Sequence, residues 1–233
     1  MSQIAENLNG VQERVSAAAK RSVREADNIQ LMAVSKTWPV EVIQEAVEAG
    51  HHLFGENRLK EGEEKIPVMS EDLEWHFIGT LQSNKVRKVL SLFSVVHSIS
   101  SMKLAQFTDR IAGELGICPR IFLELNLADE ESKAGLGKEE LLENIDVLCS
   151  FEHFDWRGLM CIPPRAETPE DARPWFEKMR EFQDDLRKRS GRELPELSMG
   201  MSGDYEVAIE EGSTIVRVGS AIFGARSAWN PKS

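Results

Sequence analysis

The chain has 233 residues, of which 41% are hydrophobic and 29% charged, a composition typical of a globular protein with a sizeable core. Its net charge of -11 at pH 7 argues against a nucleic-acid partner or an anionic membrane, because both bind basic surfaces. No apolar run is long enough to span a membrane, and the N-terminus lacks the apolar core of a signal peptide. Three widely spaced cysteines predict a reducing, cytoplasmic location, and no His or Cys cluster has the spacing of a metal site.

The first predicted element is an amphipathic helix over residues 3–24, because apolar residues recur there at helical spacing from Ile4 to Val23. Eight short apolar runs follow, and they predict strands over residues 29–35, 52–57, 74–79, 94–99, 120–126, 156–163, 197–201 and 214–219. Segments with helical periodicity lie between the runs, many with Pro at the start or Gly at the end. These predicted helices cover residues 39–50, 84–92, 102–115, 138–148, 174–189 and 203–211, with Trp175 on the apolar face of the fifth.

Eight strand–helix units after one extra helix predict a single α/β domain, a (β/α)8 TIM barrel that covers residues 1–233. A doubly wound sheet is the structural alternative, and the absence of a GxGxxG motif after the first strand disfavours it. The outer helices show no obvious hydrophobic stripe for a partner subunit. We therefore expect a monomer.

In a barrel of this kind the active site lies at the carboxyl ends of the strands, and Lys36 stands there, directly after the first predicted strand. A low-dielectric barrel mouth disfavours the charged amine, so that the neutral amine becomes available to attack an aldehyde. A lysine can equally lie along the wall with its charged head in water. Spacing alone leaves both interpretations open.

Small and polar residues mark the ends of the last two predicted strands. Ser202 follows the seventh strand, and Gly219 and Ser220 follow the eighth, where TIM barrels often bind phosphate with backbone N–H groups and hydroxyls. Arg217 lies within the eighth strand, from which it could reach a ligand or form a buried ion pair. The first and eighth strands are neighbours in a closed barrel, so an aldehyde that carries a phosphate could reach both sites. Pyridoxal 5′-phosphate (PLP) fits that description.

Eight motifs extend over nearly the whole chain. They are AVSKTWP (33–39), FGENR (54–58), WHFIGTLQSNK (75–85), VHSI (96–99), NLADEESKAGL (126–136), GLMCIP (158–163), LSMGMSGDYEVAI (197–209) and GSTIVRVGSAIFGAR (212–226). In these motifs and their order the chain resembles the YggS/PROSC family, the PLP homeostasis (PLP-binding) proteins. The resemblance implies a barrel similar to the N-terminal domain of alanine racemase, with PLP held as an internal aldimine on Lys36.

The same resemblance implies roles for the other residues at the strand ends. Ser202 would bind the phosphate through its hydroxyl, and Gly219 and Ser220 through backbone N–H groups. Arg217 would face the pyridine nitrogen. Four more residues are implied to line the pocket, namely Asn57, His76, Ser98 and Met160.

Two features argue for a binding protein rather than an enzyme. A permanent charge on Arg217 beside the pyridine nitrogen disfavours its protonation, and an unprotonated ring is a weaker electron sink. The chain also ends soon after the eighth strand, without the second domain that supplies a catalytic tyrosine in alanine racemase, and Tyr205 is its only tyrosine. We therefore expect a protein that stores, delivers or buffers PLP, with PLP-accepting apoenzymes as transient partners. The alternatives are a racemase-like PLP enzyme and a phosphate-binding barrel without PLP.

Overall fold

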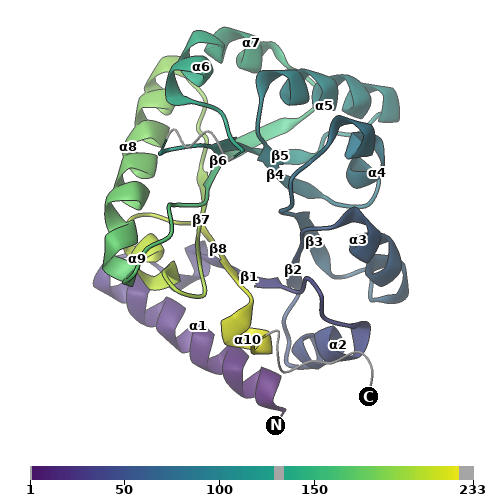
Figure 1. Ribbon diagram of the computed structural model, residues 1–233, viewed down its shortest axis with the longest axis vertical. Coiled ribbons are helices and arrows are strands. Elements are labelled where there is room, and N and C mark those ends of the chain that lie inside the picture. Colours follow the sequence, from purple (N-terminus) through teal and green to yellow (C-terminus); the bar gives the residue numbers. More distant parts are fainter. Residues whose placement is uncertain (1, 129–133, 226–233) are drawn as a thin grey trace.

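Parallel strands close into a barrel in chain order in the computed structural model, which describes residues 2–128 and 134–225 (Figure 1). The strands are β1 Gln30–Val34, β2 Leu53–Glu56, β3 Glu74–Phe77, β4 Val95–Ile99, β5 Arg120–Leu125, β6 Asp155–Cys161, β7 Glu196–Met201 and β8 Ile215–Val218. β1 pairs with β8, with Ala33 opposite Val218, and this pairing closes the sheet. The predicted barrel is confirmed, and the doubly wound sheet is wrong. Residues 129–133 of the motif at 126–136, Arg226 of the last motif, and residues 1 and 226–233 of the predicted domain lie outside the described residues.

Helices surround the barrel on the outside (Figure 1). They are α1 Gln3–Arg21, α2 Val40–Glu48, α3 Leu59–Lys65, α4 Val86–Leu90, α5 Met102–Leu115, α6 Lys138–Glu143, α7 Ile145–Ser150, α8 Arg173–Ser190, α9 Tyr205–Glu210 and α10 Ser220–Phe223. Short 3-10 helices are η1 Ala26–Asn28, η2 Ile66–Val68, η3 Ser83–Lys85 and η4 Pro169–Ala172. In the part of the chain that the structure describes, no helix is long and apolar enough to cross a membrane.

The extra N-terminal helix is present as predicted, and α1 packs beside α9 and α10 (Figure 1). Its Ser2 N-cap hydroxyl accepts the Ala5 N–H at 3.3 Å, which satisfies one of the free donors at the helix start. The helix buries an apolar stripe made of Ile4, Leu8, Val11 and Val15. The predicted end at residue 24 is wrong, because α1 ends at Arg21 and Val23 is 95% exposed with a φ of 55°.

Three further differences from the predicted helices have local causes. The predicted helix over 138–148 is divided at Asn144, which separates α6 from α7. The buried face of α8 includes Phe176 but not Trp175, which instead lies half-exposed under the ammonium group of Lys178. The sequence pattern does not predict α3, because α3 buries Gly62 and a lysine rather than an apolar stripe.

The barrel interior changes character along the strands. A cluster of five buried side chains fills one part of it, namely Met32, Val95, Phe122, Met160 and Ile215. Gly55 makes room for this packing, since a Cβ at Gly55 would lie 2.5 Å from the Met32 sulfur. Polar side chains share the interior with this cluster, and the residues that follow the strands form a pocket.

Candidate functional site

A pocket of about 450 Å³ opens beyond the carboxyl ends of the strands. Six of the predicted site residues line it, namely Lys36, Asn57, Ser202, Arg217, Gly219 and Ser220. They come from segments spread over most of the chain, because parallel strands bring all their carboxyl ends to one side of the barrel. Apolar residues complete the wall, namely Val34, Trp38, Ile78, Ile162 and Met201.

One end of the pocket is a cup formed where β7 and β8 lead into their helices. The Ser202 hydroxyl accepts N–H bonds from Gly219 at 3.1 Å and from Ala221 at 3.4 Å. Two backbone N–H groups thus lie beside one hydroxyl, and a phosphate that entered here could accept hydrogen bonds from all three. Gly200 turns the chain before this point, with a φ of +92° and no room for a Cβ, which would lie 2.5 Å from the Ala208 Cβ. Glycine is therefore required at position 200.

Arg217 lines the pocket, is almost fully buried and is held by groups on β6 and β7. Its guanidinium donates to the Ser198 carbonyl at 2.7 Å, to the Ser198 hydroxyl at 2.8 Å and to the Cys161 carbonyl at 2.9 Å. Burial lowers the pKa of Arg217, but an arginine stays protonated in proteins. Its hydrogen bonds to two carbonyls and a hydroxyl fix the orientation of the guanidinium plane, which carries a permanent positive charge.

Glu124 lies in a smaller cavity of about 220 Å³ that shares Thr80 and Ile162 with the pocket. Burial raises the pKa of Glu124, and the charge of Arg217 opposes that rise. The carboxyl in this core strand therefore faces a cavity beside the pocket rather than the packed interior.

The loop that carries Lys36 is anchored by a buried charged cluster, here called the Lys65 cluster, made of Ser35, Glu56, Glu61 and Lys65. The Lys65 ammonium uses its donors on the Ser35 carbonyl at 3.1 Å, Glu56 at 2.7 Å and Glu61 at 2.8 Å. The Ser35 hydroxyl also donates to Glu56, at 2.7 Å. Burial raises the pKa of Glu56, and the Lys65 charge opposes this. The cluster therefore fixes the backbone on one side of Lys36.

Thr37 fixes the backbone on the other side of Lys36. Its φ is 70°, a left-handed conformation that is strained for a β-branched residue. The Thr37 N–H donates to Glu61 at 2.6 Å, and this bond connects the strained residue to the Lys65 cluster. Burial opposes ionisation of Glu61, but the bonds from Lys65 and Thr37 leave its pKa below the usual value. Lys36 itself is half-buried and lines the pocket.

Asn57 offers a polar atom that a ligand could use. Its Oδ1 is buried, and among the described residues it has no hydrogen-bond partner. The backbone that follows β3 passes so close to Asn57 that a Cβ at Gly79 would clash with the Asn57 carbonyl oxygen, so this wall is tightly packed. An amine, an anion cup, a fixed guanidinium and an unsatisfied amide oxygen therefore line one pocket.

Comparison with known proteins decides the family. The family profile "Alanine racemase, N-terminal domain" matches residues 3–227. The pyridoxal phosphate homeostasis protein of Aquifex aeolicus (strain VF5) is 42% identical over 222 residues, which cover 95% of this chain and 97% of that protein. The protein of the same name from Escherichia coli (strain K12) is 42% identical over 233 residues, with 97% and 98% covered. The chain belongs to the pyridoxal phosphate homeostasis protein family.

Solved structures agree with this assignment. PipY of Synechococcus elongatus PCC7942 without PLP has a TM-score of 0.87 and 38% identity, over 95% of this chain and 100% of PipY. The structure of PipY with PLP bound has a TM-score of 0.85 and 39% identity, over 95% of this chain and 100% of PipY. Alanine racemase from Corynebacterium glutamicum has a TM-score of 0.71 at 16% identity, over 94% of this chain and 59% of that enzyme, and this likeness concerns the fold alone.

Three residues that the family resemblance implied for the pocket do not line it in this homeostasis-family barrel, namely His76, Ser98 and Met160. Each stands one residue before the end of its strand, and on β3 and β6 the residue that lines the pocket is instead the first one after the strand, Ile78 and Ile162. Met160 packs in the inner apolar cluster, and His76 is 1% exposed and bound to other side chains. The Ser98 hydroxyl is buried, and no described residue bonds to it. The wall residues that the sequence did not predict include Trp38, Ile78 and Ile162, and their signal is their position at or just after the end of a predicted strand.

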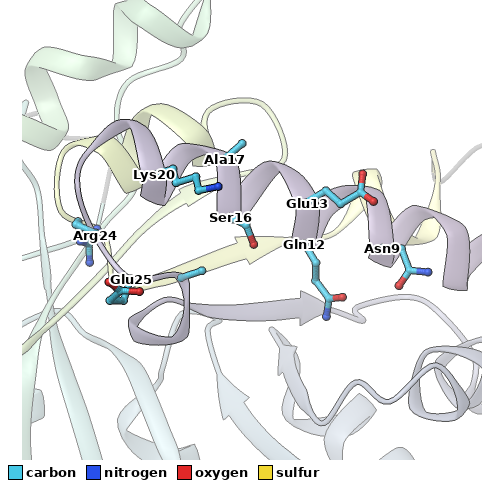
Figure 2. Close-up of a pocket in the computed structure, with 9 residues that line it drawn as sticks. Asn9, Gln12, Glu13, Ser16, Ala17, Lys20, Arg24 and Glu25 are labelled. Atoms are coloured by element: carbon cyan, nitrogen blue, oxygen red, sulfur yellow. The ribbon is translucent and has the colours of Figure 1, made fainter.

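A groove of about 660 Å³ lies elsewhere, along α1 and the turn into η1 (Figure 2). It is lined by Asn9, Gln12, Glu13, Ser16, Ala17, Lys20, Arg24, Glu25 and Ala26. The more buried of its two cations, Arg24, already binds protein groups, since its guanidinium donates to the carbonyls of Ile209 and Ser213, each at 2.8 Å. None of the predicted site residues lines this groove. The candidate site of the family fold is therefore the pocket that contains Lys36.

Proposed function

We propose that this chain binds pyridoxal 5′-phosphate at Lys36 and serves PLP homeostasis by storing, delivering or buffering the cofactor. The observation that carries the proposal is the meeting of Lys36, Arg217 and the Ser202 cup in one pocket. PLP, when bound, supplies an aldehyde that condenses with amines and a ring that withdraws electrons. The relatives named for PLP homeostasis and the PLP-bound structure of PipY support the same cofactor.

The residues present fit this cofactor. Lys36 would supply the amine that anchors the aldehyde, and its anchored loop aims that amine at the pocket. Ser202 would hold the phosphate together with the backbone N–H groups of Gly219 and Ser220, and the Ala221 N–H is close enough to join them. The unsatisfied Oδ1 of Asn57 would accept a hydrogen bond from the ligand.

Binding without robust catalysis is the role that the wall of the pocket supports. Arg217 places a permanent positive charge beside the ring, which opposes protonation there and weakens carbanion stabilisation. Tyr205, the only tyrosine of the chain, is 1% exposed and does not line the pocket. Burial raises the pKa of its hydroxyl, which disfavours the anion that a base would need. We further propose a cytoplasmic, single-domain monomer that passes PLP to apoenzymes.

Borohydride trapping tests the proposed anchor. Purified protein is incubated with PLP, reduced and digested, and the pyridoxyl group is located by peptide mass mapping. We expect the label on Lys36, no label in the Lys36→Arg variant, and an unchanged label in the control Lys85→Arg, which replaces an exposed lysine. Label on Lys85 alone, or on no lysine, would overturn the proposal.

Two further measurements separate storage from catalysis. In the Ser202→Ala variant, loss of the cup hydroxyl should raise the Kd for PLP about tenfold, as expected for about one hydrogen bond. Incubation of the PLP-loaded protein with L-alanine should yield no sustained racemisation. Turnover that Lys36→Ala abolishes would instead support the racemase-like alternative.

A further inference from the structure

A continuous series of buried polar side chains crosses the barrel from the pocket to the opposite end. This series, the polar relay, consists of Arg217, Ser198, His97, His76 and Glu74. Arg217 donates to the Ser198 hydroxyl at 2.8 Å, which lies 2.8 Å from His97 Nδ1. His97 Nε2 lies 2.9 Å from His76 Nδ1, and His76 Nε2 lies 3.0 Å from a Glu74 oxygen. All members except Glu74 are buried.

The two ends of the polar relay fix the direction of every hydrogen bond in it. An ionised Glu74 can only accept, so His76 carries its proton on Nε2 and accepts at Nδ1. His97 must then carry its proton on Nε2 and accept at Nδ1, which obliges the Ser198 hydroxyl to donate to it. Arg217 can only donate, and it binds the lone pair that the Ser198 hydroxyl has left. Each atom of the relay therefore has one consistent role.

The surroundings favour this single arrangement. Burial lowers the pKa of His76 and lowers that of His97 well below its ordinary value, so both rings are neutral at pH 7. The hydrogen bond from His76 holds the pKa of Glu74 at about 2, although burial opposes this, and Arg120 also bonds Glu74. The His97 ring stacks on Phe122, with centroids 4.3 Å apart and planes 18° apart. The His97 ring is therefore neither easily protonated nor easily reoriented.

The polar relay ends at the amino ends of the strands, away from the pocket. Glu74 is the first residue of β3 and Arg120 the first residue of β5, and the side chain of Glu74 is 34% exposed. The guanidinium in the pocket is thus connected by hydrogen bonds to a carboxylate at the far rim. Cys161 and the Ser198 carbonyl hold two other donors of Arg217 but do not extend this connection.

We propose that His97 and His76 are positioning residues for the cofactor site, which act through Ser198 to fix the orientation and electrostatic influence of the Arg217 guanidinium. This inference rests on the proposed function for its cofactor readout. A buried hydroxyl without the histidines could rotate away from Arg217, since nothing else in the relay would receive its proton. The relay removes that freedom and directs the lone pair of the hydroxyl at the guanidinium.

Nitrogen-15 NMR of the histidine rings tests the polar relay in the protein without PLP. We expect both His76 and His97 as the tautomer with the proton on Nε2, unchanged between pH 6 and 8. A proton on Nδ1 of either neutral ring would overturn the proposal. This outcome does not depend on PLP, so failure of the relay is distinguishable from failure of the proposed function.

Substitutions test whether the polar relay acts on the cofactor. His97→Leu should shift the absorption maximum of bound PLP and raise its Kd about tenfold, because the hydrogen bond from Arg217 to the Ser198 hydroxyl is then no longer held in place. His97→Gln, which can still accept from Ser198, should restore most of both. The control Val95→Ala, in the inner apolar cluster, should lower thermal stability but leave the absorption maximum unchanged. An unshifted spectrum and a Kd within about twofold of wild type in His97→Leu would overturn the proposal.

Discussion

Replacement of Lys65 by methionine is the sharpest test of how the Lys36 loop is held. Lys65 is 6% exposed and is the cation of the Lys65 cluster, where it binds two carboxylates and the Ser35 carbonyl. Methionine keeps the length and the apolar stem but leaves Glu56, which is 0% exposed, without its counter-charge. Removal of one partner from a buried ion pair costs about 3–5 kcal/mol of unfolding free energy. For a chain of this size that corresponds to a fall in Tm on the order of 10 °C.

The same helix offers a matched control. Lys60 and Glu64 pair at 3.8 Å on the surface of α3, with side chains 85% and 63% exposed. Such an i,i+4 pair contributes only about 0.3–0.5 kcal/mol, so Lys60→Met should scarcely change stability. Urea denaturation at pH 8, followed by tryptophan fluorescence, measures both variants.

The pH dependence carries a second signature. Burial raises the pKa of Glu56 in the folded state even with Lys65 present, and loss of Lys65 must raise it further. A carboxyl whose folded pKa exceeds its unfolded value binds its proton more tightly in the folded state. Its ionised form therefore lowers the unfolding free energy fully above the folded pKa, and this loss becomes smaller as the pH falls through the folded pKa. The difference between Lys65→Met and wild type should therefore shrink from pH 8 to pH 5. A Lys65→Met variant within about 1 kcal/mol of Lys60→Met at pH 8 would refute the reasoning.

Two further predictions concern the backbone and the far rim of the barrel. Gly200→Ala should lower the unfolding free energy by about 1–3 kcal/mol, because of the positive φ and the clash with Ala208, while Gly10→Ala, in open space on α1, should raise it by about 0.5–1 kcal/mol. Thermal melts of both variants check this, and equal effects would contradict it. His76 lowers the pKa of Glu74 to about 2, so this pair contributes stability above about pH 4.5 that is lost as pH falls toward 2. Glu74→Gln should remove about 1–2 kcal/mol at pH 7, after allowance for solvent screening, and little at pH 2. Urea midpoints that differ equally from wild type at both pH values would exclude this account.

The barrel could be predicted because its pattern is local. Each strand is a short apolar run, each long helix has a periodic apolar face, and their alternation leaves few topologies. The same logic predicts that Lys36, Ser202 and Gly219 lie close together, since parallel strands direct all their carboxyl ends to one rim. The strand order of the closed barrel is the predicted one, and these three residues line one pocket.

What the sequence did not predict depends on side chains inside the fold. His76 and Met160 stand near strand ends, but their side chains are held in the barrel interior, His76 by His97 and Glu74 and Met160 by the inner apolar cluster. The sequence pattern does not predict α3 because a lysine, Lys65, lies on its buried face. A buried lysine is stable only with a partner from elsewhere in the fold, here Glu56.

By itself the sequence determined the eight-stranded barrel, the extra helix and the placement of Lys36 near Ser202 and Gly219, because these follow from periodicity and from the ends of strands. Only the tertiary structure decided which polar groups meet inside. Lys65 finds Glu56 from another element, and His97 finds Ser198 across 101 positions of sequence. Such pairs depend on which side chains face inward at the same level of the barrel, and a buried charge or imidazole is stable only where the fold brings it a complementary partner.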